Sequence, residues 1–325
     1  MLEHGGRLRE AARRYGIPEA AWLDLSTGIN PLGWPVPALP AGCWHRLPQA
    51  DDGLEAAART YYGCRDILVT AGSQAAIQAL PGLRPAGRVG VLAPGYAEHA
   101  HAWARGGHAL ERLAAGDIEA ALDRLDVLVL INPNNPSGEC FAPATLLAWH
   151  RRLAARGGWL VVDEAFVDAT PQDSLAPHAG MEGLVVLRSL GKFFGLAGAR
   201  VGFTLAWPEL LAQLAETLGP WTVATPARRV ARLALEDILW QEEARRCLPQ
   251  AAARLGTLLS RAGMAPCGGT CLFQWVATGR AAAIQDTLAK QGILLRRFVI
   301  PASLRFGLPG EEAEWRRLEA ALKKI

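Results

Sequence analysis

Three short, wholly apolar runs constrain the fold of this chain more than any other feature. They cover residues 127–131, 159–162 and 184–187, and segments with helical or turn-rich patterning separate them. A strand that is apolar at every position must be covered on both of its faces. The runs therefore predict an α/β fold, with a mostly parallel central sheet and helices on both faces.

The remaining patterning extends this sheet and adds a smaller second unit. Further strands are expected over residues 67–70, 88–93 and 201–205, and helices over 7–15, 54–62, 74–80 and 145–156. A long helical stretch over 226–261 contains Pro249, where we expect the helix to break. After Gly263, strands over 272–276, 293–296 and 303–306 and helices over 281–291 and 311–323 predict an α+β domain.

The composition is that of a globular enzyme. The 325 residues are 50% hydrophobic and 20% charged, with a formal net charge of +3. The chain is too apolar for a disordered protein, and so small a charge provides no basic surface for nucleic acid. Its length favours two domains.

The start of the chain and its cysteines favour a reducing compartment. Residues 1–14 are charged almost throughout and contain no apolar core of a secretory signal, and no apolar run approaches the ~20 residues that span a bilayer. The six cysteines are scattered, and Cys267 and Cys271 have no matching His or Cys pair at zinc spacing. We therefore expect a cytoplasmic protein with no membrane contact and no metal site.

Polar or glycine-rich loops follow four of the predicted strands. They cover residues 71–74 (AGSQ), 132–138 (NPNNPSG), 163–166 (DEAF) and 188–200. Ligands of open α/β sheets bind beyond the carboxyl ends of the strands. Taken singly, each loop has an ordinary interpretation as a helix cap or a turn. Taken together, in this order, they indicate a pyridoxal 5′-phosphate site.

The phosphate of this cofactor needs N–H donors and a cation. Backbone amides of Gly72, Ser73 and Gln74 lie at the expected start of a helix, where unpaired N–H groups and the helix dipole favour an anion. Ser189 can add a hydroxyl and Arg200 a fork-shaped cation. These five residues are the predicted phosphate site.

The ring of the cofactor needs three further groups. Asp163 is the predicted carboxylate that keeps the pyridine nitrogen protonated, and Asn135 the predicted donor to the phenolic oxygen. Lys192 is the predicted amine that forms the Schiff base. Desolvation and neighbouring cations lower the pKa of such a lysine, so that it acts first as a nucleophile and later as a proton carrier.

The motifs of competing site classes are missing from the sequence. The segment around Lys192 lacks the frame of a nucleotide P-loop, no G-x-G-x-x-G follows a first strand, and no G-x-S-x-G marks a hydrolase. The seven histidines form no H-E-x-x-H. His99 and His101 lie two apart on an expected helix and so point to different faces.

The strand-end motifs resemble those of the fold-type I pyridoxal phosphate enzymes. The resemblance rests on NPNNPSG at 132–138, DEAF at 163–166, SLGK at 189–192 and the spacing from Lys192 to Arg200, and it covers nearly the whole chain. It points to the branch that holds histidinol-phosphate aminotransferases and the threonine-phosphate decarboxylases of cobalamin biosynthesis. The resemblance implies a homodimer and places Tyr96 over the cofactor ring.

The same resemblance implies the residues that bind the substrate. Arg305 matches the family arginine that grips the α-carboxylate through a bidentate fork, with Arg296 or Arg297 assisting. The segments HGG at 4–6 and STGINPLG at 26–33 look like those of the decarboxylases, in which the N-terminal segment covers the site. His4, Gly5, Gly6 and Asn30 are the implied contacts of the substrate phosphate.

The resemblance also implies how the chain is divided. We expect an N-terminal segment over residues 1–29 that covers the site and joins the small domain, and a large cofactor-binding domain over 30–225. A linking helix and the small C-terminal domain follow over 226–325.

Two positions depart from the family pattern. Phe166 stands where many aminotransferases of this fold have a tyrosine that bonds the ring oxygen, which leaves Asn135 as the main partner. Leu47, in RLPQ at 46–49, stands where the histidinol-phosphate branch has a tyrosine that reaches the partner subunit's cofactor phosphate.

The functional prediction is a pyridoxal phosphate enzyme that decarboxylates L-threonine O-3-phosphate to aminopropanol phosphate. Transamination of the histidinol-phosphate type uses the same residues and is the alternative. A non-catalytic binding module of this fold is a second alternative, although Lys192 and Asp163 argue against it.

Overall fold

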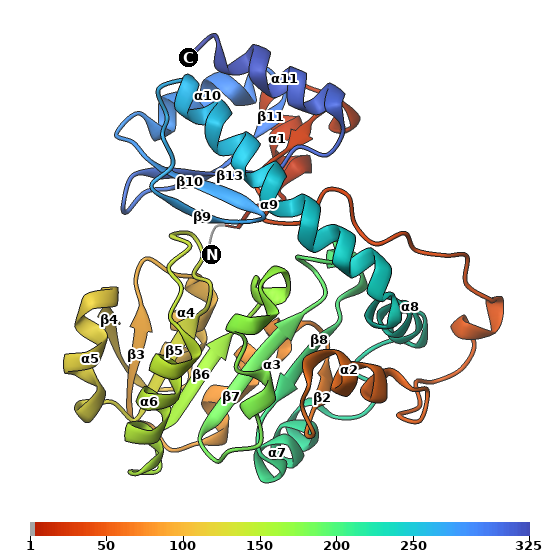
Figure 1. The fold of residues 1–325 in the computed structure, drawn as a ribbon, viewed down its shortest axis with the longest axis vertical. Helices are drawn as coiled ribbons and strands as arrows, with labels where there is room; N and C mark the ends of the chain where they lie inside the picture. Colours follow the sequence, from red (N-terminus) through yellow and green to blue (C-terminus); the bar gives the residue numbers. More distant parts are fainter. Residues whose placement is uncertain (1–3) are drawn as a thin grey trace.

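A seven-stranded sheet forms the centre of the larger unit in the computed structural model, which describes residues 4–325 (Figure 1). Its strands are β2 (Leu68–Thr70), β3 (Arg88–Leu92), β4 (Ala109–Leu113), β5 (Val127–Ile131), β6 (Trp159–Asp163), β7 (Leu184–Ser189) and β8 (Gly202–Leu205). Their order is β2-β8-β7-β6-β5-β3-β4, and β8 alone runs antiparallel to its neighbours. The predicted mostly parallel α/β sheet is therefore confirmed.

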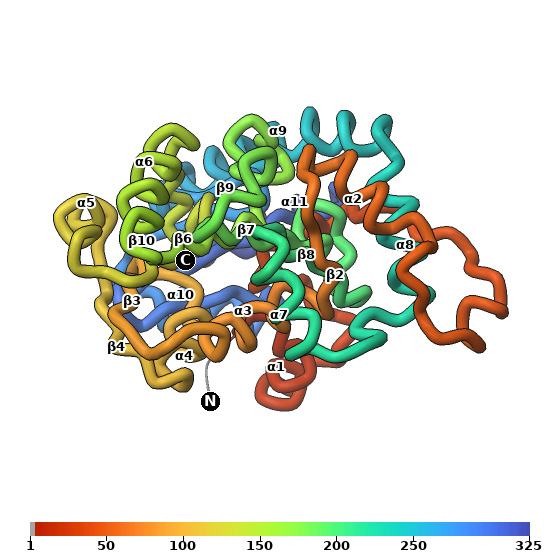
Figure 2. Tube along the Cα trace, turned by 90° about the horizontal axis from the view of Figure 1, so that it is seen from below, coloured from red at the N-terminus to blue at the C-terminus, as the bar shows by residue number. Residues whose placement is uncertain are grey.

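Helices cover both faces of this sheet because its central strands are apolar at every position. Val127, Val129 and Val161 pack against α3 (Ser73–Ala79), α4 (Ala97–Arg105) and α7 (Pro208–Leu218). The alternate residues Leu128 and Val162 face the other way, toward α2 (Leu54–Tyr62), α5 (Ile118–Ala121) and α6 (Pro143–Ala154). Figure 2 shows these two helical layers on either side of the strands.

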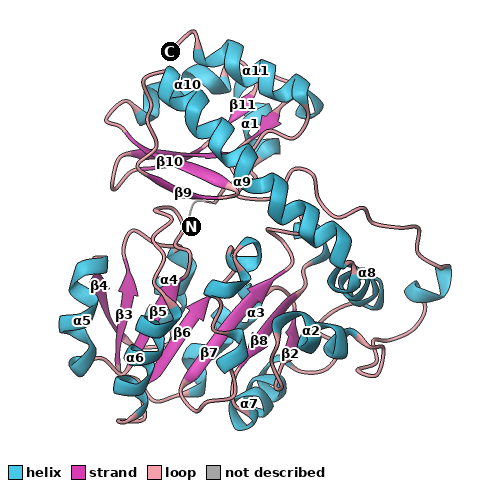
Figure 3. Cartoon of the chain, viewed as in Figure 1, coloured by secondary structure: helices cyan, strands magenta, loops and turns pink. Residues whose placement is uncertain are grey.

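The smaller unit is built on a four-stranded antiparallel sheet of order β12-β13-β10-β9 (Figure 3). The strands are β9 (Gly268–Thr270), β10 (Phe273–Ala277), β12 (Arg296–Phe298) and β13 (Ser303–Gly307), with α10 (Ala281–Ala289) and α11 (Glu312–Leu322) beside them. The described part of the N-terminal segment joins this unit. There α1 (Leu8–Tyr15) precedes β1 (Leu23–Asp24), which pairs in parallel with β11 (Ile293–Leu294).

The long helical stretch breaks at Asp237, so the predicted break at Pro249 is wrong. The stretch consists of α8 (Thr225–Glu236) and α9 (Ile238–Arg261), and α9 continues through Pro249 toward the smaller unit. Asp237 leaves helical geometry and its side chain accepts a hydrogen bond from the backbone of Trp240 at 3.1 Å, as an N-cap does. At Pro249, burial of the neighbouring Leu248 offsets the lost backbone bond.

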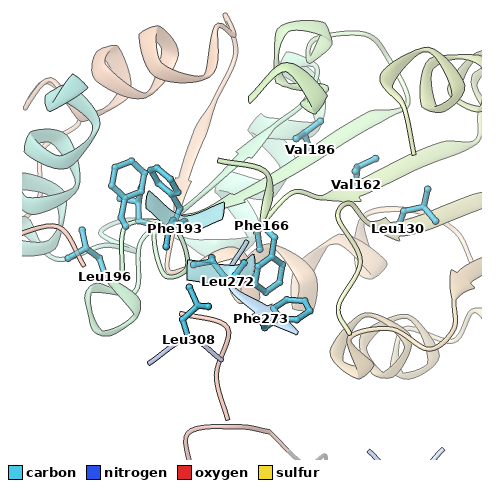
Figure 4. Packing of buried hydrophobic residues seen from close by; sticks show 14 of the residues in the cluster. Leu130, Val162, Phe166, Val186, Phe193, Leu196, Leu272, Phe273 and Leu308 are labelled. Atoms are coloured by element: carbon cyan, nitrogen blue, oxygen red, sulfur yellow. The ribbon is translucent and has the colours of Figure 1, made fainter. Parts of the chain in front are cut away.

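The two units share an apolar contact (Figure 4). Phe166 of the larger unit packs edge-on against Phe273 of the smaller unit, with ring centroids 5.2 Å apart. Leu272 and Leu308 belong to the same cluster. Within residues 4–325, no helix combines the length and the apolar character needed to cross a bilayer.

Candidate active site

A cavity of about 1110 Å³ lies where the ends of the parallel strands meet the smaller unit. Tyr96 enters it after β3, Asn135 after β5 and Lys192 after β7, while Arg305 comes from β13. Tyr96, Asn135 and Lys192 meet here because the carboxyl ends of parallel strands share one edge of the sheet. Arg305, 209 positions after Tyr96, reaches the same space from the smaller unit.

Lys192 lies in a water-poor part of this cavity. Its Nζ is 5.7 Å from the centroid of the Phe166 ring. Burial, with a further contribution from the positive charge of Arg305, lowers the pKa of Lys192 to about 8. A substantial fraction of this amine is therefore uncharged near neutral pH, which is the form that attacks a carbonyl carbon.

Asp163 ends β6 and is held by two donors. Its Oδ2 lies 2.9 Å from Nε2 of His99, and its Oδ1 accepts a hydrogen bond from the backbone of Ala165 at 3.1 Å. Both Asp163 and His99 are 3% exposed. The sequence analysis missed His99 as a functional residue, since the separation of 64 positions gives no local signal for this contact.

Arg305 fixes the orientation of Asn135. Its Nη1 donates to Oδ1 of Asn135 at 2.6 Å, and its Nη2 donates to the backbone oxygen of Ser26 at 2.7 Å. The amide nitrogen of Asn135 therefore remains as a donor, as the predicted bond to a phenolic oxygen requires. Burial, with a smaller contribution from Arg296, lowers the pKa of Arg305 to about 10.

The predicted phosphate residues lie together at the start of α3. Gly72 has a φ of +69°, and a Cβ added there would lie 2.8 Å from Nη2 of Arg200. Only glycine lets the guanidinium come this close to the backbone. Ser73 begins α3, and Oγ of Ser189 accepts a hydrogen bond from the backbone of Gly191 at 3.2 Å. A cation beside a helix N-terminus fits a phosphate.

The side chain of Gln74 points away from this phosphate position. Its Nε2 donates to Glu98 at 2.9 Å, and its Oε1 accepts from the hydroxyl of Tyr96 at 3.3 Å. Only its backbone amide is left for the predicted role. Burial, followed by the charges of Glu98 and Asp163, raises the pKa of Tyr96 to about 12, so the hydroxyl stays protonated.

The N-terminal segment reaches the same cavity. His4, Gly5 and Gly6 line it, and the backbone amide of Gly6 donates to Oγ of Ser26 at 2.7 Å. Arg296 lines it as well, with its guanidinium 5.0 Å from the Phe298 ring centroid.

Asn30, by contrast, is not among the residues that line the cavity. Its Nδ2 donates to the backbone oxygen of Phe193 at 2.9 Å, and its Oδ1 accepts from the backbone of Leu32 at 3.0 Å. The residue is 5% exposed. Its side chain thus holds the loop after Lys192, and its place as a contact of the substrate phosphate stays a prediction.

A second charged cluster lies on the opposite side of the same strand ends. Arg188 donates to Glu164 at 2.7 Å and to Asp168 at 2.5 Å, and Ser174 donates to Glu164 at 2.5 Å. Burial alone would lower the pKa of Arg188, but the charges of Asp168 and Glu164 raise it above its ordinary value. Arg188 is 2% exposed, and both of its carboxylate partners are fully buried.

Comparisons with known proteins agree with this geometry. Residues 44–322 match the family model of aminotransferase class I and II. The chain is 61% identical to a threonine-phosphate decarboxylase of Pseudomonas aeruginosa over 99% of this chain and 97% of that protein. It is 44% identical to one of Sinorhizobium sp over 100% of this chain and 98% of that protein.

The fold is also that of a solved enzyme with the cofactor in place. The histidinol-phosphate aminotransferase of Sinorhizobium meliloti, in complex with pyridoxal-5′-phosphate, superimposes with a TM-score of 0.84 at 22% identity. The match covers 99% of this chain and 95% of that chain.

Proposed function

The chain belongs to the family of class I and II aminotransferases, and on that premise we propose that it decarboxylates L-threonine O-3-phosphate to aminopropanol phosphate for cobalamin biosynthesis. Its fold is that of the fold-type I enzymes, and its cofactor is pyridoxal 5′-phosphate. The observation that carries the proposal is the 61% identity to a threonine-phosphate decarboxylase over nearly the full length of both proteins.

The residues around the cavity fit this cofactor. Asp163 would hold the ring nitrogen and Asn135 the ring oxygen, while Tyr96 would lie against the ring. The phosphate would be held by the backbone of Gly72, Ser73 and Gln74, together with Ser189 and Arg200. Bound pyridoxal phosphate supplies an electron sink for the pair left on the substrate α-carbon when a bond to that carbon breaks.

Arg305 is the proposed ligand of the substrate α-carboxylate. Its two terminal nitrogens each use one N–H in the bonds to Asn135 and to Ser26, so each retains a second N–H for a carboxylate. His4, Gly5, Gly6 and Arg296 line the same cavity and are the proposed contacts of the substrate phosphate.

Lys192 is the proposed proton carrier once the substrate has displaced it from the cofactor. With a pKa of about 8, its amine can hold a proton at neutral pH and release it at moderate cost. In decarboxylation, it would return a proton to the α-carbon after carbon dioxide leaves.

We further propose a homodimer in the cytoplasm. Several large apolar side chains are exposed on one monomer, namely Trp44 (68%), Leu47 (62%), Trp221 (59%) and Leu239 (81%). Such a surface favours burial against a second subunit. All six cysteines carry free thiols, as expected in a reducing compartment. Light scattering of the purified protein should give twice the monomer mass of 34.8 kDa.

One assay separates the candidate reactions. The purified holoenzyme is incubated with O-phospho-L-threonine, and carbon dioxide and aminopropanol phosphate are measured. Histidinol phosphate with 2-oxoglutarate is run in parallel. We expect stoichiometric carbon dioxide from phosphothreonine. Glutamate formation without carbon dioxide would instead establish the aminotransferase, and a colourless protein that takes up no cofactor would establish a non-catalytic module.

A further inference from the structure

Glu98 accepts hydrogen bonds from three side chains and lies next in the chain to residues that line the cavity. It lies in the first turn of α4, where its Oε2 accepts from Nε2 of Gln74 at 2.9 Å and from Nε2 of Gln78 at 3.1 Å. Its Oε1 is 2.8 Å from Nε2 of His4. The Glu98 side chain is only 14% exposed, so these donors, rather than water, satisfy most of its charge.

These donors come from the two sides of the site. His4 lines the cavity from the N-terminal segment, and its ring centroid lies 6.0 Å from that of Tyr96. Gln74 belongs to the first turn of α3, next to Gly72 and Arg200, and also bonds Tyr96. Glu98 therefore connects the proposed substrate side of the cavity with the proposed cofactor-phosphate side.

We propose that Glu98 is a positioning residue that fixes the N-terminal segment over the cavity through His4 and couples it to the start of α3 through Gln74. The proposal rests on the proposed function for the identity of the substrate. Occupation of one side of the site then stabilises the other side, because both depend on the same carboxylate.

The chemistry of the side chain explains why glutamate is needed here. A carboxylate has two acceptor oxygens and no donor, so it can accept from His4 on one oxygen and from the two glutamines on the other. A glutamine of the same shape has one acceptor oxygen and one donor nitrogen. Glu98→Gln therefore loses the negative charge and can no longer accept on both sides, so the charge-assisted bond to His4 or the bonds to Gln74 and Gln78 are weakened.

Hydrogen–deuterium exchange of the holoenzyme tests the contact without reference to activity. In Glu98→Gln we expect the peptide over residues 4–10 to exchange about tenfold faster than in the wild type, because the segment loses its anchor. The peptide over 73–79 should change in the same direction. The matched control is Glu243→Gln on α9, where the exposed carboxylate bonds Arg246 and neither residue lines the cavity, and it should leave both peptides unchanged.

Steady-state kinetics test the coupling to substrate. We expect Glu98→Gln to raise KM for O-phospho-L-threonine about tenfold, the effect of one charge-assisted hydrogen bond, with kcat changed much less. In a His4→Ala background, Glu98→Gln should raise KM by a smaller factor than in the wild type, since the bond to His4 is already absent and only the bonds to the two glutamines are left to change.

Distinct results overturn the inference and the proposed function. Unchanged exchange over residues 4–10 in Glu98→Gln, or strictly additive effects with His4→Ala, would show that Glu98 does not anchor the segment. A wild-type enzyme that releases no carbon dioxide from phosphothreonine would refute the substrate but leave the exchange result valid. If Glu98→Gln fails to fold, the half-exposed His4→Ala removes the same contact and should alone accelerate exchange over residues 4–10.

Discussion

Asp163 and Glu164 are neighbours at the end of β6, yet they belong to two charged clusters that differ in how their charges are paired. Successive side chains of a strand point to opposite faces, so Asp163 turns toward His99, which lines the cavity, and Glu164 turns toward Arg188 in the interior. On the inner side, Arg188 is paired with two carboxylates, Glu164 and Asp168. On the cavity side, Lys192 and Arg305 are two cations whose pKa values are lowered by burial and, to a smaller extent, by a neighbouring arginine.

The comparison shows that the end of β6 carries two side chains with different tasks. Glu164 helps to fix the strand end, and Asp163 is available to the cofactor. The inner cluster is closed, because Arg188 pairs with both carboxylates and all three side chains are buried. It fixes the ends of β6 and β7, from which Asp163 and Lys192 project. The cavity cluster is open, because its groups keep donors and charge for ligands. The predictions below test this contrast, starting with the largest effect.

Lys192→Ala should abolish activity and spare the fold. We expect a loss of at least about 10³-fold in kcat and no visible absorbance of lysine-bound cofactor, since the nucleophile and the proton carrier are both removed. The urea midpoint should stay near that of the wild type. Lys290→Ala, which breaks only an exposed pair with Asp286, is the control and should keep both colour and activity.

Arg188→Met should have the reverse effect and unfold the protein readily. Removing the guanidinium leaves Glu164 and Asp168 buried without a counter-charge, which costs about 3–5 kcal/mol. Urea denaturation of the apoenzyme, in which no cofactor contributes, measures this loss. Arg124→Met, which breaks a half-exposed pair with Glu111, should change the midpoint little. Equal effects of the two variants would contradict the closed character of the inner cluster.

The pH dependence of cofactor attachment should report the open cluster directly. The folded pKa of Lys192, about 8, lies below its ordinary value of 10.5, so the amine is mainly neutral above pH 8 and mainly charged below. The rate at which the apoenzyme attaches the cofactor should fall about tenfold for each pH unit below 8. This rate is followed by the growth of visible absorbance.

Arg305→Met should move this pH profile to higher pH. Removing a neighbouring positive charge makes the charged lysine less unfavourable and raises its pKa toward 10.5. A shift to lower pH, or none, would show that burial alone sets the pKa of Lys192.

Much of this site could be predicted from the sequence because its residues follow apolar strands directly. The runs at 127–131 and 159–162 became β5 and β6 with nearly the expected bounds, which placed Asn135 and Asp163 at one edge of the sheet. Lys192, Arg200 and Gly72 were placed by the same reasoning. In each case, the end of a strand fixes where the site residue lies, and the local sequence pattern shows where the strand ends.

The residues that sequence reasoning missed are those whose roles depend on tertiary contacts. Asn30 lies in a segment of family type, but its side chain bonds the loop after Lys192 instead of facing the cavity. The helix break lies at Asp237, whose carboxylate also accepts a hydrogen bond from Trp34, 203 positions away. His99 lies on a helix, as expected, yet nothing local signals that its ring meets Asp163.

His99→Gln should have the smallest effect and decides how firmly the open cluster is held. Glutamine can donate to Oδ2 of Asp163 from nearly the position of Nε2, so we expect a decrease of a few-fold in kcat, whereas His99→Phe, which cannot donate, should lower kcat by about tenfold or more. The pH dependence of the bound cofactor's absorbance is a readout that a change in packing alone would not move. Its midpoint should shift more in His99→Phe than in His99→Gln.

His108 is also a buried histidine, and it bonds the backbone oxygen of Pro81, so His108→Gln serves as the control. If His99→Phe lowered kcat no more than His108→Gln does, the bond from His99 would not be needed to hold Asp163. The end of β6 and the backbone amide of Ala165 would then be sufficient to fix the Asp163 carboxylate.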